Sequence, residues 1–277
     1  IEDRDGICLF AGGDDVLAVL PGERALEAAK RLASEFRDAM AVLFSFSAVL
    51  MAASMMPNLI AGNVMIDEEV AIPWISLPQP FTAIKFGVLV DPLSIIIANV
   101  VAFISFLIMV YSVGYMHGDP GLTRYWFLMN FFIGSMLLLV LSDNFLQLLV
   151  GWEGVGLCSY GLIGYYHKDE KKRWIGGPEG KAPFATPSYC GMKAFVMTSI
   201  GDAGLLIAVF ILFGYGKTFN FMQLYSDAPT WLGAMSSTPG LLSLVILLLL
   251  LGPIGKSAQF PLHEWLPEAM AGPTSVS

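Results

Sequence analysis

Charged residues are scarce in this chain of 277 residues, where they make up 14% of the total against 56% hydrophobic residues. Soluble globular domains contain about 25% charged residues, so the composition excludes a soluble fold, a disordered chain and a coiled coil. The formal charge of −8 also excludes a general nucleic-acid-binding surface. A membrane protein with several spans is the class that remains.

Cysteine and histidine are also rare, with three residues of each type. Cys8, Cys158 and Cys190 are far apart and odd in number, which excludes a disulfide scaffold. No set of these residues has the spacing of a metal site, and the apolar part of the chain lacks a glycine-rich nucleotide motif. The sequence of that part therefore predicts no bound metal ion or nucleotide.

The charged residues are distributed unevenly. Residues 1–38 contain 14 of the 38 charged side chains, so we expect two unlike pieces, 1–38 and 39–277. The chain begins at Ile1 without the basic segment of a signal peptide, and it stops at Ser277 without a tail. We interpret both ends as cuts and expect a fragment of a longer protein.

Six apolar segments are long enough to cross a membrane, because a bilayer core of ~30 Å requires about 20 apolar residues in a helix. They are 39–61, 91–115, 124–142, 144–166, 191–214 and 240–258. The predicted fold is therefore an all-α polytopic bundle with about six spans. The acidic, proline-rich segment 62–90 predicts a short hairpin or an extended loop.

Lysine and arginine lie mostly on one side of these spans. They precede the first span, open the third, and cluster in the loop 167–190. Cytoplasmic loops of membrane proteins carry the excess of basic residues. We therefore expect the loop 167–190 in the cytoplasm and the segments 62–90 and 215–239 on the other side.

Four ionisable residues fall within or next to the spans, namely Glu153, Lys193, Asp202 and Lys256. A charge at the centre of a bilayer costs several kcal/mol, so such residues face the bundle interior or a water-filled cavity. Glu153 and Lys256 predict a proton path, with a static ion pair between them as the alternative. Asp202 and Lys193 are further candidates, although Lys193 can also extend to the interface as an anchor.

Gly252 and Pro253 precede Lys256, and proline disrupts a helix because it lacks an N–H group. We expect the last span to be broken near residues 252–256, with Gly252-Pro253 as the cause, since broken helices at membrane depth line cavities. A lysine beside such a break can change its protonation when its hydration or partner changes. His263, which follows with Glu264, is an additional candidate for the proton path.

Five motifs in order resemble the antiporter-like L subunit of respiratory complex I and its archaeal relatives. The resemblance covers residues 39–277 and is strongest at Gly151-Trp152-Glu153-Gly154-Val155-Gly156. The other motifs are Phe86-Gly87-Val88-Leu89-Val90-Asp91-Pro92, Tyr115-Met116-His117-Gly118-Asp119-Pro120, Asp143-Asn144, and Gly255-Lys256-Ser257-Ala258-Gln259 followed by Trp265-Leu266-Pro267-Glu268-Ala269-Met270-Ala271-Gly272-Pro273-Thr274.

The resemblance implies a fold with two inverted repeats, each of which contains a broken helix. This chain would hold only the first repeat and therefore a single half-channel. It implies that Lys256 carries or gates the proton and that Glu153 modulates its charge. It also implies other membrane subunits as partners, with no cofactor in this chain. Flavin and iron–sulfur clusters are expected in the partner subunits. The whole complex would be an oxidoreductase that takes electrons from NADH or reduced deazaflavin and passes them to a quinone or methanophenazine.

Two details depart from the family pattern. Ser199 stands where the family usually has an arginine that partners the aspartate matching Asp202. The loop 167–190 is longer and more charged than in bacterial relatives, which favours the plasma membrane of a prokaryote of archaeal type. A subunit of a cation/proton antiporter or of a membrane-bound hydrogenase is the alternative function.

The first 38 residues do not fit this family. Two apolar runs flank Gly12-Gly13-Asp14-Asp15 and predict a hairpin followed by an amphipathic helix. This segment resembles the palm domain of the large subunit of type III CRISPR effectors, and Asp14 and Asp15 match its metal-binding aspartates. A membrane-anchored nucleotide cyclase is therefore a further alternative, but a lone hairpin and helix cannot form a nucleotide pocket. The junction near Asp38 is open to three explanations, namely a chimeric assembly, a genuine rearrangement and a genuine fusion.

Overall fold

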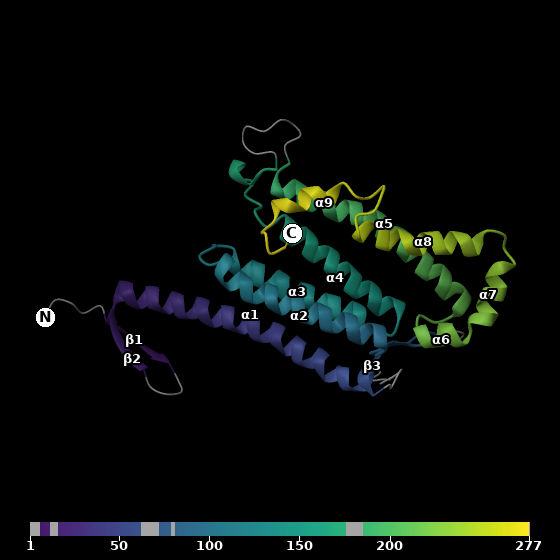
Figure 1. Cartoon of the computed structure of the whole chain (residues 1–277), viewed down its shortest axis with the longest axis horizontal. Coiled ribbons are helices and arrows are strands. Elements are labelled where there is room, and N and C mark those ends of the chain that lie inside the picture. The colour runs from purple at the N-terminus through teal and green to yellow at the C-terminus, as the bar shows by residue number, and fades with distance from the viewer. Residues whose placement is uncertain (1–5, 12–15, 62–71, 79–80, 176–184, 277) are drawn as a thin grey trace.

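The computed structural model describes residues 6–11, 16–61, 72–78, 81–175 and 185–276. Within this part of the chain, five helices are long and apolar enough to cross a membrane: α1 (Gly22–Ile60, over Ala33–Pro57), α2 (Pro92–Tyr115), α3 (Leu122–Val140), α4 (Phe145–Ile163) and α5 (Pro187–Gly216). The helices pack in chain order across the bundle, with α1 against α2, α3 against α4, and α4 against α5 (Figure 1). The predicted helical bundle is thereby confirmed.

The spans start where the sequence provides capping side chains. The Asp91 carboxylate accepts a hydrogen bond from the Ser94 backbone at 2.6 Å, and the Asp91 backbone N–H donates to the Ser94 hydroxyl at 2.8 Å. Pro92 sits in the first turn of α2. Asn144 caps α4 by accepting from the Gln147 backbone at 2.8 Å. Such caps satisfy the N–H groups that a helix leaves unpaired at its start.

The N-terminal hairpin consists of β1 (Gly6–Ala11) and β2 (Val16–Pro21), which pair antiparallel. The helix that follows, α1, runs without interruption through the predicted boundary at residues 38 and 39. Asp38 accepts a hydrogen bond from Trp126 Nε1 at 2.7 Å, and Arg37 Nη1 donates to Thr123 Oγ1 at 2.8 Å. The junction segment thus docks on α3, while the proposed division into two pieces stays a prediction.

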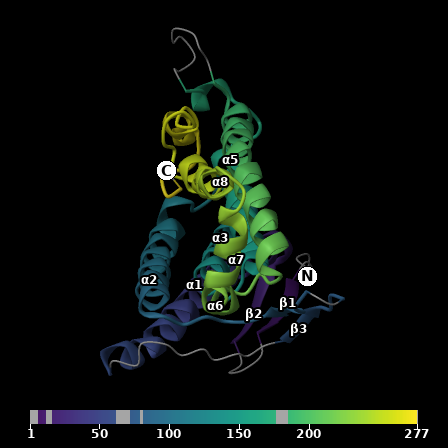
Figure 2. The ribbon, with the colours of Figure 1, turned by 90° about the vertical axis from the view of Figure 1, so that its right-hand side faces the viewer.

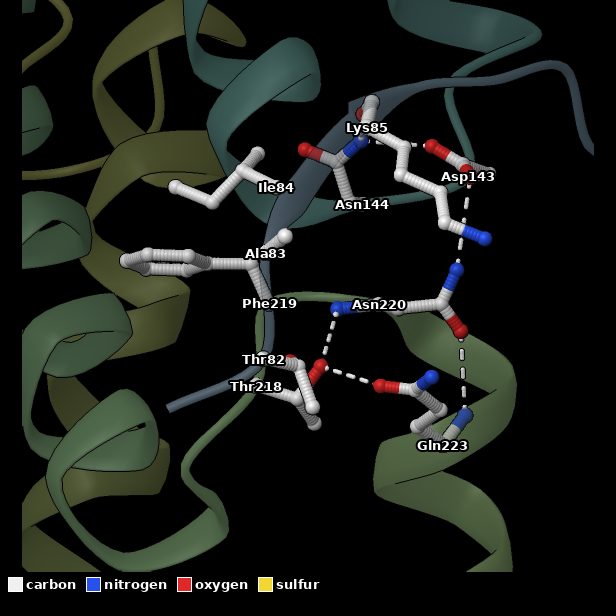
Figure 3. Close-up of a pocket in the computed structure, with 10 residues that line it drawn as sticks. All are labelled: Thr82, Ala83, Ile84, Lys85, Asp143, Asn144, Thr218, Phe219, Asn220 and Gln223. Carbon is white, nitrogen blue, oxygen red and sulfur yellow. Dashed lines mark hydrogen bonds between the residues drawn. The ribbon is translucent and has the colours of Figure 1, made fainter. Parts of the chain in front are cut away.

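A polar cluster ties three segments together beside the start of α4 (Figure 3). The buried carboxylate of Asp143 accepts from Asn144 Nδ2 at 2.5 Å and from Asn220 Nδ2 at 3.3 Å. Nearby, β3 (Ile72–Ile75) and β4 (Ile84–Phe86) form the short antiparallel pair that the segment 62–90 predicted. The cluster encloses a cavity of about 30 Å³, so its side chains serve mainly to fix these loops.

The last span differs from the prediction. Helix α8 (Leu241–Lys256) continues through Gly252 and Pro253 and ends only at Lys256. The helix thus continues past Gly252-Pro253 and breaks at the far edge of the predicted region 252–256. Beyond Lys256 the chain turns away from the helix at Ser257 and Ala258, and the φ of Ala258 is 51°. A proline removes one helical hydrogen bond, and close packing of Gly252 and Gly255 against α5 keeps this segment helical.

The chain around α8 is bent elsewhere. The short helices α6 (Phe221–Ser226) and α7 (Ala228–Ser236) precede it, and α7 meets α8 at 112°. After α8, the short helix α9 (Trp265–Glu268) and a 3₁₀ turn η2 (Ala269–Ala271) fold back along α5. A second 3₁₀ turn, η1 (Lys171–Arg173), lies in the basic loop. Helices α5 and α8 lie against each other in both views (Figures 1 and 2).

Glycine allows this close contact between α5 and α8. A Cβ atom added to Gly201 would lie 2.5 Å from the backbone oxygen of Leu251, and one added to Gly255 would lie 3.3 Å from that of Thr198. Small residues let the backbones of membrane helices approach closely. Each of these glycines directly precedes an ionisable residue, Asp202 and Lys256 respectively.

We expect Gly201→Ala to separate α5 from α8, because the new methyl group meets backbone rather than a flexible side chain. Overpacking of this kind costs about 1–3 kcal/mol, so the melting temperature in detergent should fall clearly. Gly214→Ala is the matched control, since the same helix has nothing within 4 Å of that position. Equal melting temperatures for the two variants would contradict this account of the contact.

Candidate functional site

Lys256 lies at the end of α8 with its ammonium group inside the bundle. Its Nζ atom is 3.5 Å from Oδ2 of Asp202 and donates a hydrogen bond of 3.1 Å to the backbone oxygen of Trp152. The two charged side chains are only 16% and 6% exposed. The structure therefore joins two of the predicted site residues, Lys256 and Asp202, in a buried ion pair.

Trp152 completes this cluster from α4. Its Nε1 atom donates to Oδ1 of Asp202 at 2.5 Å, and its ring centroid lies 5.7 Å from Nζ of Lys256. Each oxygen of the Asp202 carboxylate consequently has its own partner. A buried charge is tolerated when it is both paired and hydrogen-bonded, and this arrangement meets both conditions.

A glycine makes room for the ammonium group. A Cβ atom at Gly156 would lie 2.5 Å from Nζ of Lys256. The motif Gly151-Trp152-Glu153-Gly154-Val155-Gly156 thus supplies the carbonyl that Lys256 contacts and the space that its side chain occupies. This gives a physical reason for the small residues on that face of α4.

Ser199 does not take the place of the family's arginine. Its hydroxyl donates to the backbone oxygen of Phe195 at 2.8 Å, within its own helix. Asp202 is instead held by Lys256 and Trp152. The aspartate therefore keeps a cationic partner in this chain, supplied by α8 rather than by α5.

Glu153 is exposed on α4, one residue from Trp152. Among the described residues, no hydrogen bond or ion pair joins Glu153 to Lys256, whose carboxylate partner is Asp202. A static Glu153–Lys256 ion pair is thus not present in this structure. The modulating role of Glu153 stays a prediction.

The two remaining candidates in the membrane part lie at the other end of α5 or beyond α8. Lys193 Nζ is 2.8 Å from Oε1 of Glu268 and 3.7 Å from Oε2 of Glu264. His263 is exposed, and its ring lies beside that of Phe260 with centroids 5.8 Å apart. Lys193 thereby fastens α9 to α5, and within the described contacts neither residue is bonded to Lys256.

Asp14 and Asp15 lie outside the described residues. Among the residues that are described, no group of three or more His, Cys, Asp or Glu side chains could hold a metal ion. The buried thiols of Cys158 and Cys190 are both free. Among the described residues, the cluster of Lys256, Asp202 and Trp152 brings a buried ammonium group and a buried carboxylate together.

Sequence patterns alone do not single out two residues that bind the charged side chains of the site. Trp152 and Glu268 both stand inside motifs that carried the family resemblance. The signal for Trp152 was its place next to Glu153 in a glycine-rich span, where a polar N–H group needs a partner. Glu268 gave a weaker signal, because an acidic residue near a span end is usually solvated.

Family models match three parts of the chain. Residues 142–277 match the model described as NADH:quinone oxidoreductase/Mrp antiporter, TM, and residues 74–126 match NADH-Ubiquinone oxidoreductase (complex I), chain 5 N-terminus. Residues 1–65 match the second palm domain of Cas10/Cmr2. The last match extends past residue 38 into the first span.

The curated relatives agree with the first two models. The chain is 44% identical over 194 residues to NADH-quinone oxidoreductase subunit L of Escherichia coli (strain K12), covering 70% of this chain and 29% of that protein. It is 36% identical over 239 residues to the chloroplastic NAD(P)H-quinone oxidoreductase subunit 5 of Zygnema circumcarinatum, covering 83% and 32%. The chain therefore spans about a third or less of the length of these relatives.

Two solved structures share the fold. The membrane-bound sulfane sulfur reductase, an archaeal respiratory membrane complex, matches with a TM-score of 0.66 at 18% identity, over 86% of this chain and 43% of that chain. The Mrp complex from Dietzia sp. DQ12-45-1b matches with a TM-score of 0.60 at 25% identity, over 88% and 26%. The two family models and the curated relatives show that the chain, over residues 74–277, belongs to the antiporter-like membrane subunits of NADH:quinone oxidoreductases, the family of subunit L.

Proposed function

We propose that this chain forms the first proton-transfer unit of a proton-translocating subunit in a complex I-type quinone oxidoreductase. The observation that carries the proposal is the buried ammonium group of Lys256, held between Asp202 and the Trp152 carbonyl. Ionisable residues inside the membrane mark ion pathways. Lysine suits this role because its protonation responds to burial and to its partners.

In this proposal Nζ of Lys256 carries the transferred proton. The carboxylate of Asp202 stabilises the charged ammonium, and Trp152 positions that carboxylate through its Nε1–H group. Glu153 lies next to Trp152 on α4 and adds a second negative charge near Lys256. Protonation of Glu153 removes this charge and so lowers the affinity of Lys256 for its proton. Weakening either carboxylate favours release of the proton from Nζ.

Electron transfer belongs to other subunits in this proposal. Flavin and iron–sulfur clusters in partner subunits supply the redox chemistry, with NADH or reduced deazaflavin as donor and a quinone or methanophenazine as acceptor. Relatives such as subunit L of Escherichia coli carry the name of a quinone oxidoreductase, which supports this assignment. The exposed position of Glu153 suits contact with a neighbouring membrane subunit.

We further propose that the loop 167–190 faces the cytoplasm of a prokaryotic cell. The described part of this loop carries Lys168, Lys171, Lys172 and Arg173, and cytoplasmic loops hold the excess of basic residues. An archaeal source stays a prediction. The curated relatives named above come from a bacterium and a chloroplast.

A cation/proton antiporter subunit is the rival function, because one family model and one solved structure include Mrp antiporters. The identity of 44% to a subunit L favours the oxidoreductase. Coupling to NADH oxidation distinguishes the two functions, since an antiporter works without an electron donor.

The function can be tested in a chimera in which the matching segment of this chain replaces its counterpart in the Escherichia coli subunit L, an alignment of 194 residues. In inverted membrane vesicles, NADH should drive proton uptake by the chimera. Lys256→Ala and Glu153→Ala should each lower that uptake by about a hundredfold or more, which is the scale of losing a proton-transfer group. Reduction of an artificial acceptor by NADH should remain intact.

Lys171→Ala is the matched control, because Lys171 is exposed and far in sequence from the cluster. Proton uptake at the unmodified rate in both Lys256→Ala and Glu153→Ala would refute the assignment of these residues. Sodium-dependent cation exchange without NADH would instead establish the antiporter.

Trp152→Phe tests the positioning of Asp202. The variant keeps an aromatic ring but removes the N–H group that holds Oδ1 of Asp202. A hydrogen bond to a charged group contributes about 1.5–3 kcal/mol, so we expect a loss of proton uptake smaller than in Lys256→Ala and a shift in its pH profile. An unchanged pH profile would show that this hydrogen bond has no part in proton transfer.

A further inference from the structure

A basic pocket lies where α3 begins and α4 ends, far along the chain from Lys256. It has a volume of about 350 Å³. Its charged side chains are Asp119, Arg124, Lys168, Glu170, Lys172 and Arg173, and Tyr165, Tyr166 and His167 line it as well. Because α3 starts at Leu122 and α4 stops at Ile163, the pocket sits at the end of the spans, where lipid headgroups lie.

The two carboxylates of the pocket are already engaged. Asp119 accepts hydrogen bonds of 2.7 Å from the Tyr165 hydroxyl and from the Gly121 backbone. Glu170 pairs with Lys172 at 2.7 Å. Among the described residues, no carboxylate lies within ion-pair distance of Arg124, Lys168 or Arg173, so the pocket holds surplus positive charge.

The pKa of Glu170 is also consistent with an excess of positive charge in the pocket. The hydrogen bond from Lys172, together with the positive charges of Lys172, Lys168 and Arg173, holds the pKa of that carboxyl below its usual value. A positive potential of this kind favours any anion that enters.

Aromatic rings fix two of the cations. The guanidinium of Arg173 lies 3.9 Å from the ring centroid of Tyr166, and that of Arg124 lies 4.8 Å from that of Tyr165. Arg124 also donates to the Tyr165 carbonyl and contacts His167 Nδ1 at 2.9 Å. Since these side chains are already ordered, binding an anion costs less entropy.

An apolar stripe continues from this pocket along α3. Phe127 and Phe131 follow Arg124 at helical spacing, are 66% and 41% exposed, and stack with centroids 5.9 Å apart. A soluble anion would gain nothing from such a stripe, whereas an acyl chain would cover it. The combination of a cationic pocket and an apolar stripe thus matches one kind of ligand.

We propose that this pocket binds the phosphate of an anionic phospholipid, with an acyl chain lying over Phe127 and Phe131. Basic pockets at the membrane surface recognise anionic lipid headgroups in this way. The site uses none of the residues assigned to proton transfer. It rests on the membrane placement of the chain and not on the proposed function.

The experiment is native mass spectrometry of the full chain, delipidated in detergent and titrated with dioleoylphosphatidylglycerol or dioleoylphosphatidylcholine. We expect the anionic lipid to bind more tightly than the zwitterionic one. Lys168→Gln and Arg173→Gln should each weaken phosphatidylglycerol binding about fivefold, the scale expected for one basic residue near an anionic headgroup.

Lys171→Gln is the matched control, because it removes the same charge from the same short turn but does not line the pocket. This variant should change the affinity for phosphatidylglycerol by less than about twofold, because the charge of an exposed lysine outside the pocket is screened by salt. Equal losses in the pocket variants and the control, or equal affinity for both lipids, would overturn the site.

A competition arm distinguishes a lipid from a soluble phosphate. Glycerol 1-phosphate carries the headgroup charge without acyl chains and should displace the lipid only weakly. Phe127→Ala should weaken lipid binding without altering melting, since this ring is exposed. Efficient displacement by glycerol 1-phosphate, together with unchanged binding in Phe127→Ala, would refute the lipid assignment.

Discussion

The ion pair between Lys256 and Asp202 is the constraint around which the rest of the bundle is arranged. Two nearly buried charges inside a membrane protein are stable only if they stay close and fully hydrogen-bonded. This requirement fixes how near α8 must approach α5, which explains glycine at positions 201 and 255. It also fixes α4, because Trp152 supplies one partner to each charge.

The supports at the two ends of the bundle serve the same purpose. At one end, the polar cluster around Asp143 and Asn220 binds the start of α4 to the turn after α5. At the other end, the pair of Lys193 and Glu268 fastens the chain that follows α8 back onto α5. Rigid ends hold α5 and α8 in a fixed position at the ion pair. A movement of Lys256 or Asp202 is therefore transmitted to the neighbouring helices and not to flexible loops.

Much of this architecture could be predicted from the sequence. Long apolar runs gave the spans, and the high cost of a charge in lipid pointed to Asp202 and Lys256. The position of the helix break could not be predicted from Pro253, because packing against α5 outweighs the loss of one hydrogen bond. The pairing of Lys256 with Asp202 rather than Glu153 depends on which residues face each other across three helices. Sequence spacing alone does not contain that information.

The uninterrupted helix α1 has a mechanical consequence. Its 39 residues correspond to ~58 Å, about twice the thickness of a bilayer core. The helix shows no break where it leaves the apolar span, which begins at Ala33. A helix that continues through both parts couples their movements. A force applied to the β1–β2 hairpin would therefore tilt or rotate the first span, and the contact of Asp38 with Trp126 would pass that movement on to α3.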